Sequence, residues 1–178
     1  MPNKNNESSM KIIFSHGKES GPKATKITAM QTVASELNIE TESLDYRGLE
    51  TVETRVEKLL EYIEQECRDE KIVLVGSSMG AYVSLVASQK LKNVIGLFLL
   101  APAVHFPGYE VEGMSFENLP TSIIHGWNDE IIPVEKAIQF AQEYQLAIQL
   151  VADDHRLSES IPLINEQFRS FLNSLKTL

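Results

Sequence analysis

The sequence predicts an α/β fold: a three-layer α/β/α sandwich around a mostly or fully parallel sheet of about six strands. Two observations carry this prediction. Apolar, strand-like runs alternate along the chain with segments of helical periodicity. One of these runs, residues 72–75, leads through the turn GSSMG into an apolar segment of helical character. Strands that alternate with helices favour a parallel sheet covered by helices on both faces.

Six segments have the composition expected of strands: residues 11–15, 42–45, 71–76, 94–100, 121–125 and 147–151. The spacing of apolar side chains predicts helices between and after them, around residues 30–37, 52–63 and 81–87, and at about 134–144 and 158–175. We expect residues 1–10 to form a loose tail. Residues 11–178 show no second boundary and are expected to form a single domain.

Composition limits the classes of partner. The chain has 178 residues, of which 43% are hydrophobic and 23% charged, enough for one domain with a sizeable core. Its 25 acidic and 16 basic residues give a net charge of -9, which argues against nucleic acid or an anionic membrane surface as a partner. A single cysteine, Cys67, excludes an internal disulfide framework. Without an apolar signal core near residue 1 or a membrane-length apolar stretch, we expect a soluble cytoplasmic protein.

The turn at residues 76–80 carries the strongest chemical signal. It reads GSSMG, which fits the G-x-S-x-G pattern of a nucleophile elbow, and its strand-turn-helix setting is the one in which that pattern is meaningful. The outer glycines allow strand and helix to approach closely, while the central residue, Ser78, is held exposed. Ser77 is the competing nucleophile, but its position predicts that it points away from the tip. The alternative interpretation is a turn of small residues without chemistry.

Two later turns contain the other groups that a serine nucleophile needs. Asp129 follows the apolar run at 121–125, and His155 follows the one at 147–151. A serine hydroxyl requires a base within hydrogen-bond reach, and that base requires an acid to fix its tautomer. Because loops at the carboxyl ends of parallel strands gather at one edge of the sheet, these three residues are expected to converge.

The sequence resembles the α/β-hydrolase superfamily, in particular a small serine esterase or thioesterase without a lid. The residues that carry the resemblance are FSHG at 14–17, DYRG at 45–48, GSSMG at 76–80, GWNDEIIP at 126–133, and His155. The chain order Ser78, Asp129, His155 is also the order of that superfamily. The resemblance implies that these residues form a catalytic triad and that the backbone N–H groups of Met79 and Lys18 form the oxyanion hole. It implies no cofactor.

The substrate pocket is less well defined by the sequence. Residues 101–120 are too short for a separate lid domain, and their apolar side chains either wall an acyl group or simply cover the sheet. For the turn at 16–17, an ordinary turn with a packed histidine remains an alternative, and Trp127 either shields the acid loop or merely packs. The candidate pocket residues are His16, Gly17, His105, Phe106, Met114 and Trp127.

The expected reaction is hydrolysis of a small carboxylic ester or thioester through an acyl-Ser78 intermediate. A non-catalytic binding module with the same fold is the alternative from another class, and carbon-carbon cleavage or perhydrolysis by the same triad is a third possibility. Asp153 and Asp154 adjoin His155, but the four histidines have no metal-ligand spacing, so no metal is expected. Acyl chain length, leaving group and oligomeric state are left open by the sequence.

Overall fold

The computed structural model describes residues 9–177; residues 1–8, which contain most of the predicted tail, and residue 178 lie outside the described part. Strands and helices follow in the order β1 (Met10–Ser15), α1 (Thr25–Glu36), β2 (Glu40–Leu44), α2 (Val52–Glu66), β3 (Lys71–Ser77), α3 (Met79–Ser88), β4 (Val94–Leu100), β5 (Thr121–Gly126), α4 (Val134–Tyr144), β6 (Ala147–Val151) and α5 (Ile161–Leu175).

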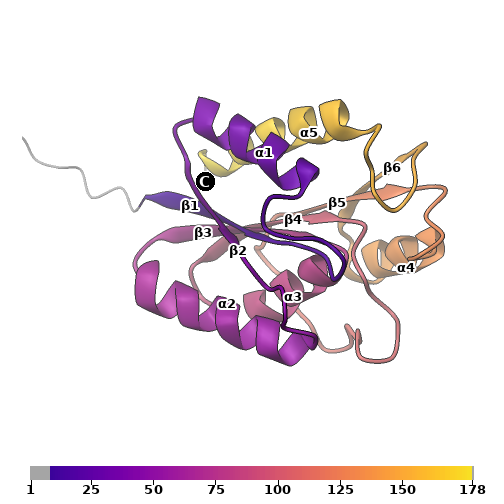
Figure 1. Cartoon of the computed structure of the whole chain (residues 1–178), viewed down its shortest axis with the longest axis horizontal. Coiled ribbons are helices and arrows are strands. Elements are labelled where there is room, and N and C mark those ends of the chain that lie inside the picture. Colours follow the sequence, from indigo (N-terminus) through magenta and orange to yellow (C-terminus); the bar gives the residue numbers. More distant parts are fainter. Residues whose placement is uncertain (1–8, 178) are drawn as a thin grey trace, which may run out of the picture.

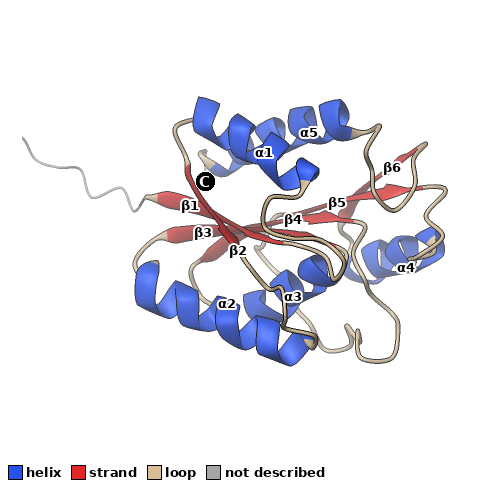
Figure 2. Cartoon of the chain, in the orientation of Figure 1, coloured by secondary structure: helices blue, strands red, loops and turns tan. Residues whose placement is uncertain are grey.

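The strands form one six-stranded sheet in the order β2-β1-β3-β4-β5-β6, and every pair is parallel. Helices α1 and α5 cover one face of the sheet, and α2, α3 and α4 cover the other (Figures 1 and 2). The predicted three-layer α/β/α sandwich is therefore confirmed. None of the helices within residues 9–177 has both the length and the apolar character needed to cross a membrane.

Side chains alternate between the two faces of the sheet and build a core on each. In β3, Leu74 packs into the core under α2, α3 and α4, whereas its neighbours Val73 and Val75 pack into the core under α1 and α5. The central strands β1, β3 and β4 are buried on both sides, so they read as continuous apolar runs. This double burial is the reason that their sequence signal is strong.

The observed boundaries agree closely with those predicted for β4, β6 and α4, and differ elsewhere by a few residues. Strand β2 begins at Glu40 because an edge strand can include polar residues on its exposed side. Strand β1 begins at Met10, and the preceding Ser9 carbonyl accepts the N–H of Lys71. Residues 9 and 10, predicted as part of the tail, are thus attached to the sheet.

The strand order places a topological switch point between β1 and β3. From β1 the chain moves outward to β2, and from β3 it moves outward in the other direction through β4, β5 and β6. Ligands of open parallel sheets bind in the crevice at such a point, beyond the carboxyl ends of the strands. The loops that leave β1 and β3 there are the ones containing Gly17 and Ser78.

Candidate active site

Ser78 occupies the single-residue turn between β3 and α3. Its backbone has φ 56° and ψ -120°, a conformation that costs a non-glycine residue about 1–3 kcal/mol. The N–H of Ser78 donates to the carbonyl of Leu100 at 2.9 Å, and the Ser78 carbonyl accepts N–H groups from Ala81 and Ala103. The sheet and helix therefore hold the strained turn in place, as expected for a nucleophile elbow.

The two glycines of the motif are required by contacts with backbone atoms. A Cβ on Gly76 would lie 2.4 Å from the carbonyl oxygen of Gly80, and a Cβ on Gly80 would lie 2.0 Å from the carbonyl oxygen of Ser15. Backbone of a central strand cannot move away from such a contact without disturbing the sheet. The space between β1, β3 and α3 is thus set by the absence of side chains at these two positions.

Substitution of Gly80 by alanine is expected to lower the free energy of unfolding by at least about 3 kcal/mol, since overpacking against backbone has no side chain to absorb it. Urea denaturation followed by circular dichroism measures the loss. Gly21→Ala is the matched control, because its Cβ would only touch the Arg47 side chain, at an ordinary 3.5 Å. Equal stability of the two variants would contradict this account of the elbow.

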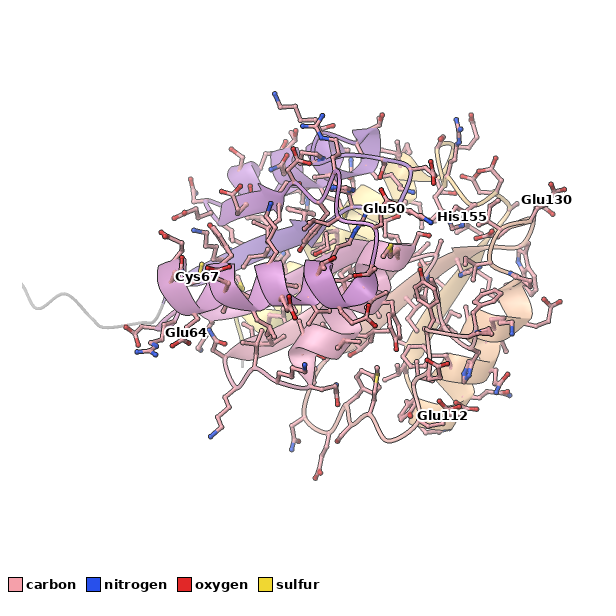
Figure 3. All side chains as sticks on the ribbon, turned by 60° about the horizontal axis from the view of Figure 1, so that its bottom comes forward. Glu50, Glu64, Cys67, Glu112, Glu130 and His155 are labelled. Carbon is pink, nitrogen blue, oxygen red and sulfur yellow. The ribbon has the colours of Figure 1, made fainter. Side chains whose placement is uncertain are left out.

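The structure brings Ser78, His155 and Asp129 together from three separate loops. His155 Nε2 lies 3.1 Å from Ser78 Oγ, and His155 Nδ1 lies 2.7 Å from Asp129 Oδ2. An ionised carboxylate can only accept, so the Nδ1 proton points to Asp129 and Nε2 is left free to accept from the serine hydroxyl. His155, which is labelled in Figure 3, follows strand β6. This is the geometry that a base and its orienting acid require.

Asp129 is held by four donors although its carboxylate is fully buried. Oδ1 accepts the N–H groups of Ile131 and Ile132, and Oδ2 accepts from His155 and lies 3.2 Å from His125 Nε2. Burial on its own would raise the pKa of Asp129, but the hydrogen bonds from His125, His155 and Ile132 outweigh it and hold this pKa well below its usual range. Asp129 therefore stays ionised beside His155.

His125 is a residue whose contact with the acid the sequence did not reveal. Its Nε2 lies 2.8 Å from the carbonyl of Ile132, so that nitrogen carries the proton, which is shared with Asp129 Oδ2. The ring is completely buried, and its Nδ1 has no protein partner among the described residues. The i, i+4 spacing of His125 and Asp129 across a tight turn is the one signal that could have indicated the contact.

Lys26 ties helix α1 to the loop that carries His155, because its Nζ donates to the carbonyl of Arg156 at 2.7 Å. Burial lowers the pKa of Lys26 to about 8, although Asp153, Asp154 and Asp129 act in the opposite direction. Between this value and the ordinary 10.5, the unfolded chain binds more protons than the native one. The free energy of unfolding should therefore increase as pH rises through this window.

The pH-dependent contribution of Lys26 to the free energy of unfolding should disappear in Lys26→Met. Between pH 7 and pH 9.5, the free energy of unfolding of the unmodified protein is expected to rise relative to that of the variant by about 1–2 kcal/mol, the equivalent of roughly one pKa unit. Urea denaturation at both pH values measures the difference. Lys23→Met, at an exposed lysine in the turn that precedes α1, should show no such change. A difference that falls as pH rises would contradict the assigned direction.

The two predicted oxyanion donors lie at the switch point. The N–H of Met79 is the first of α3 and, like the first N–H of any helix, lacks an intrahelical acceptor. Lys18 follows Gly17, and a Cβ on Gly17 would lie 3.6 Å from Ser78 Cβ, so this loop lies directly against the serine. Helix starts are suited to anions.

Of the predicted pocket residues, Gly17, Phe106 and Trp127 have positions compatible with that role. Gly17 lies against Ser78. Phe106 is half-buried, belongs to neither core cluster, and has Lys136 Nζ 4.5 Å from its ring centroid. Trp127 is 54% exposed, two residues before Asp129.

Three of the predicted pocket residues have contacts that are typical of a packing role. His16 is fully buried, with Nδ1 bonded to the Gly17 carbonyl and Nε2 to the N–H of Tyr46, so it is a packed histidine in a turn. The ring of His105 packs against Phe140 and lies 3.1 Å from Glu143, which directs it along α4. These contacts favour the alternative of a packed histidine for His16 and a packing role for His105, so neither position supports the predicted pocket role.

The position of Met114 also gives no support to its predicted place in the wall of the acyl site. Its neighbour Ser115 exchanges two hydrogen bonds with Gln89, which caps the end of α3. Gln89 is 11 residues after Ser78, so this anchor is about 17 Å from the nucleophile along the helix. Met114 packs instead against the core on that side of the sheet. The composition of residues 101–120 could not reveal which end of α3 each part would reach.

The acidic pair beside His155 has structural partners. Asp153 is buried and accepts the N–H and hydroxyl of Ser160, which orders the turn before α5. Asp154 accepts the N–H of Arg156. Within the described residues, neither carboxylate is hydrogen-bonded to the His155 ring, whose partners are Asp129 and Ser78. Within residues 9–177, no group of three or more His, Cys, Asp or Glu side chains is arranged to hold a metal ion.

Comparisons with known proteins place the fold in a family. A protein of the α/β-hydrolase superfamily from Xanthomonas campestris pv. campestris is 31% identical, with a TM-score of 0.82 over 93% of this chain and 99% of that one. Est1E from Butyrivibrio proteoclasticus (19% identity, TM-score 0.77, 96% and 89% covered) and mouse alpha/beta hydrolase domain-containing protein 10 (19%, 0.76, 93% and 90%) share the fold.

A comparison with curated protein sequences gave no match. The model of one family, UPF0227, described as an uncharacterised protein family, matches residues 11–118. This match includes all but the first residue of β1, the elbow and β4, and thus the structural centre of the sheet. The chain therefore belongs to UPF0227 and to the α/β-hydrolase superfamily.

Proposed function

We propose that this protein is a serine hydrolase that cleaves a small carboxylic ester or thioester through an acyl-Ser78 intermediate. The observation that carries the proposal is the continuous set of contacts from Ser78 Oγ through His155 to Asp129, at 3.1 and 2.7 Å. Membership of a hydrolase superfamily supports it, and so does the esterase name of Est1E, a protein of the same fold.

In the first half of the reaction, His155 Nε2 takes the Ser78 proton as the hydroxyl oxygen attacks the carbonyl carbon. The N–H groups of Met79 and Lys18 then stabilise the oxyanion, and His155 returns the proton to the departing alcohol or thiol. In the second half, His155 activates water against the acyl-enzyme, and Ser78 is released. Asp129 keeps the imidazole in the correct tautomer and stabilises its charged form.

The test uses purified full-length protein without added cofactor. We expect turnover of short p-nitrophenyl esters or acyl thioesters, together with labelling of Ser78 by a fluorophosphonate, located by mass spectrometry. Labelling with no turnover on a broad ester and thioester panel would retain the reactive serine but point to other chemistry of the same triad. Neither labelling nor turnover would favour a binding module that has kept the fold.

Phe106 is expected to select the acyl group. In Phe106→Ala, the ratio of kcat/KM for a hexanoate ester to that for an acetate ester should fall about tenfold, because each methylene contributes about 1–3 kcal/mol in an apolar pocket. Met114→Ala is the control, since Met114 packs against the core and its neighbour Ser115 is bonded to Gln89 at the far end of α3. It should lower the thermal midpoint and leave the ratio unchanged. A ratio that changes only in Met114→Ala would place the acyl site elsewhere.

A further inference from the structure

A buried arginine without a carboxylate partner lies beside the loop that carries the proposed oxyanion donor. Arg55, in the first turn of α2, is 2% exposed. Its Nε donates to the carbonyl of Leu49 at 2.9 Å, and its Nη1 to the carbonyls of His16 at 3.1 Å and Gly17 at 3.4 Å. Among residues 9–177, no carboxylate lies within the 4.0 Å ion-pair distance of its guanidinium.

Such a cation needs an explanation, because burying a charge without a counter-ion costs several kcal/mol unless other polar groups compensate. Here the compensation consists of carbonyl groups and the ring of Tyr46, whose centroid is 5.4 Å from the guanidinium carbon. The start of α2 lies on the side of the molecule that also carries His155: Figure 3 shows Glu50 and His155 toward one end and Cys67, at the end of α2, toward the other. The charge is therefore placed near the candidate site.

The carbonyl of Gly17 is held by a second donor. His16 Nε2 accepts the backbone N–H of Tyr46 at 2.9 Å, and a backbone nitrogen can only donate. The ring proton is consequently on Nδ1, which donates to the Gly17 carbonyl at 2.7 Å. Burial lowers the pKa of His16, which keeps the ring in this neutral form. Arg55 and His16 thus both donate to one carbonyl oxygen.

Holding this carbonyl also orients the N–H of Lys18. The Gly17 carbonyl and the Lys18 N–H belong to one planar peptide group, and in the trans form they point in opposite directions. Because the carbonyl is turned toward Arg55 and His16, the N–H is turned away from them. Gly17 itself lies against Ser78, so this peptide borders the serine at which an oxyanion would form.

We propose that Arg55 is a positioning residue of the oxyanion hole, which fixes the Gly17–Lys18 peptide and places a permanent positive charge behind it. This inference rests on the proposed acyl-transfer function. A cation that polarises a donor peptide in a poorly solvated site strengthens the donor toward a negatively charged oxygen. The effect should be larger in the tetrahedral intermediate than in the bound neutral ester, so it should appear in kcat more than in KM.

The experiment compares Arg55→Met and Arg55→Lys with the unmodified protein. Arg47→Met is the control, because Arg47 is an exposed arginine of the neighbouring loop whose partner is Asp45. For each we measure kcat and KM on one short ester, the thermal midpoint, and the inhibition constant of an alkyl boronic acid. That inhibitor forms a negatively charged tetrahedral adduct with a serine hydroxyl and reports on the oxyanion hole directly.

We expect Arg55→Met to lower kcat and boronic acid affinity by about tenfold to a hundredfold, with KM changed less than about threefold. This is somewhat below the loss of about 10²–10³ seen when a donor itself is removed. Arg55→Lys should be intermediate, since an ammonium keeps the charge but lacks the fork that reaches several carbonyls at once. The control should match the unmodified protein.

Unchanged kcat and boronic acid affinity in Arg55→Met would overturn the inference. A lower thermal midpoint with normal affinity for the boronic acid would overturn it as well, because that pattern describes packing alone. If Arg55→Met does not fold, kcat and the boronic acid inhibition constant of Arg55→Lys decide: values equal to those of the unmodified protein would overturn the inference. An unmodified protein with neither turnover nor labelling removes the proposed function and this inference together, whereas an active one with unaffected variants removes only the inference.

Discussion

Replacement of Ser78 by alanine is expected to reduce kcat by about 10⁵- to 10⁶-fold and to abolish fluorophosphonate labelling. The reason is that the nucleophile and base act as one unit, so loss of either removes covalent catalysis altogether. Ser78 is the only serine in hydrogen-bond contact with His155 within the described residues. The measurements are initial rates on a p-nitrophenyl ester and intact-protein mass spectrometry after labelling.

Ser77→Ala is the matched control, because Ser77 is the adjacent hydroxyl and ends strand β3. It should keep labelling at position 78 and lose little activity. A label that mapped to Ser77, or equal losses in the two variants, would show that the elbow does not select the central residue. Ser78→Ala should also relieve none of the backbone strain, since alanine is as restricted as serine at a φ of 56°.

The second large effect is expected from Asp129→Asn, which should lower kcat by about 10⁴-fold with little change in the fold. An amide can donate as well as accept, so it permits the His155 tautomer whose proton is on Nε2, and that nitrogen then cannot accept the Ser78 proton. It also removes the negative charge that stabilises the imidazolium. Rates near pH 8 and a urea denaturation curve separate the catalytic loss from any change in stability.

Asp154→Asn provides the comparison for this variant. Asp154 adjoins His155 in sequence but bonds to the N–H of Arg156, and its loss should change kcat less than about threefold. If Asp154→Asn or Asp153→Asn were the crippling change, the acid would have to be reassigned to the turn beside the base. In that case the 2.7 Å contact between His155 and Asp129 would serve structure only.

The fold was largely predictable because its central strands are buried on both faces and helices α2, α4 and α5 are amphipathic. The positions of Ser78, Asp129 and His155 could be predicted as well, because each follows a recognisable strand and parallel strands bring such loops together. What could not be predicted is the direction of a side chain within an irregular connection. The His105 ring packs against Phe140 of α4, and the loop beside Met114 bonds to Gln89 at the end of α3, and neither contact leaves a local pattern.

For Arg55, the sequence could indicate a buried charge but not the groups that bind it. It lies on the apolar stripe of α2, three residues after Val52 and four before Leu59, and a cation at such a position departs from the pattern. That departure is a usable signal of a buried charge. It does not say which groups accept from the guanidinium, because those are carbonyls, and carbonyls are present at every residue.

Strand β6 has a consequence for how this protein would lose activity. It is an edge strand, paired only with β5, and most of its residues are partly exposed. Beyond it, the loop to His155 is attached by the N–H groups of Trp127 and Asn128, which donate to the carbonyls of Val151 and Asp153. Peripheral segments of this kind open at lower free energies than the rest of a domain. Mild denaturant should therefore inactivate the molecules while most of the sheet is still native, and amide exchange in β6 should follow the loss of activity rather than global melting.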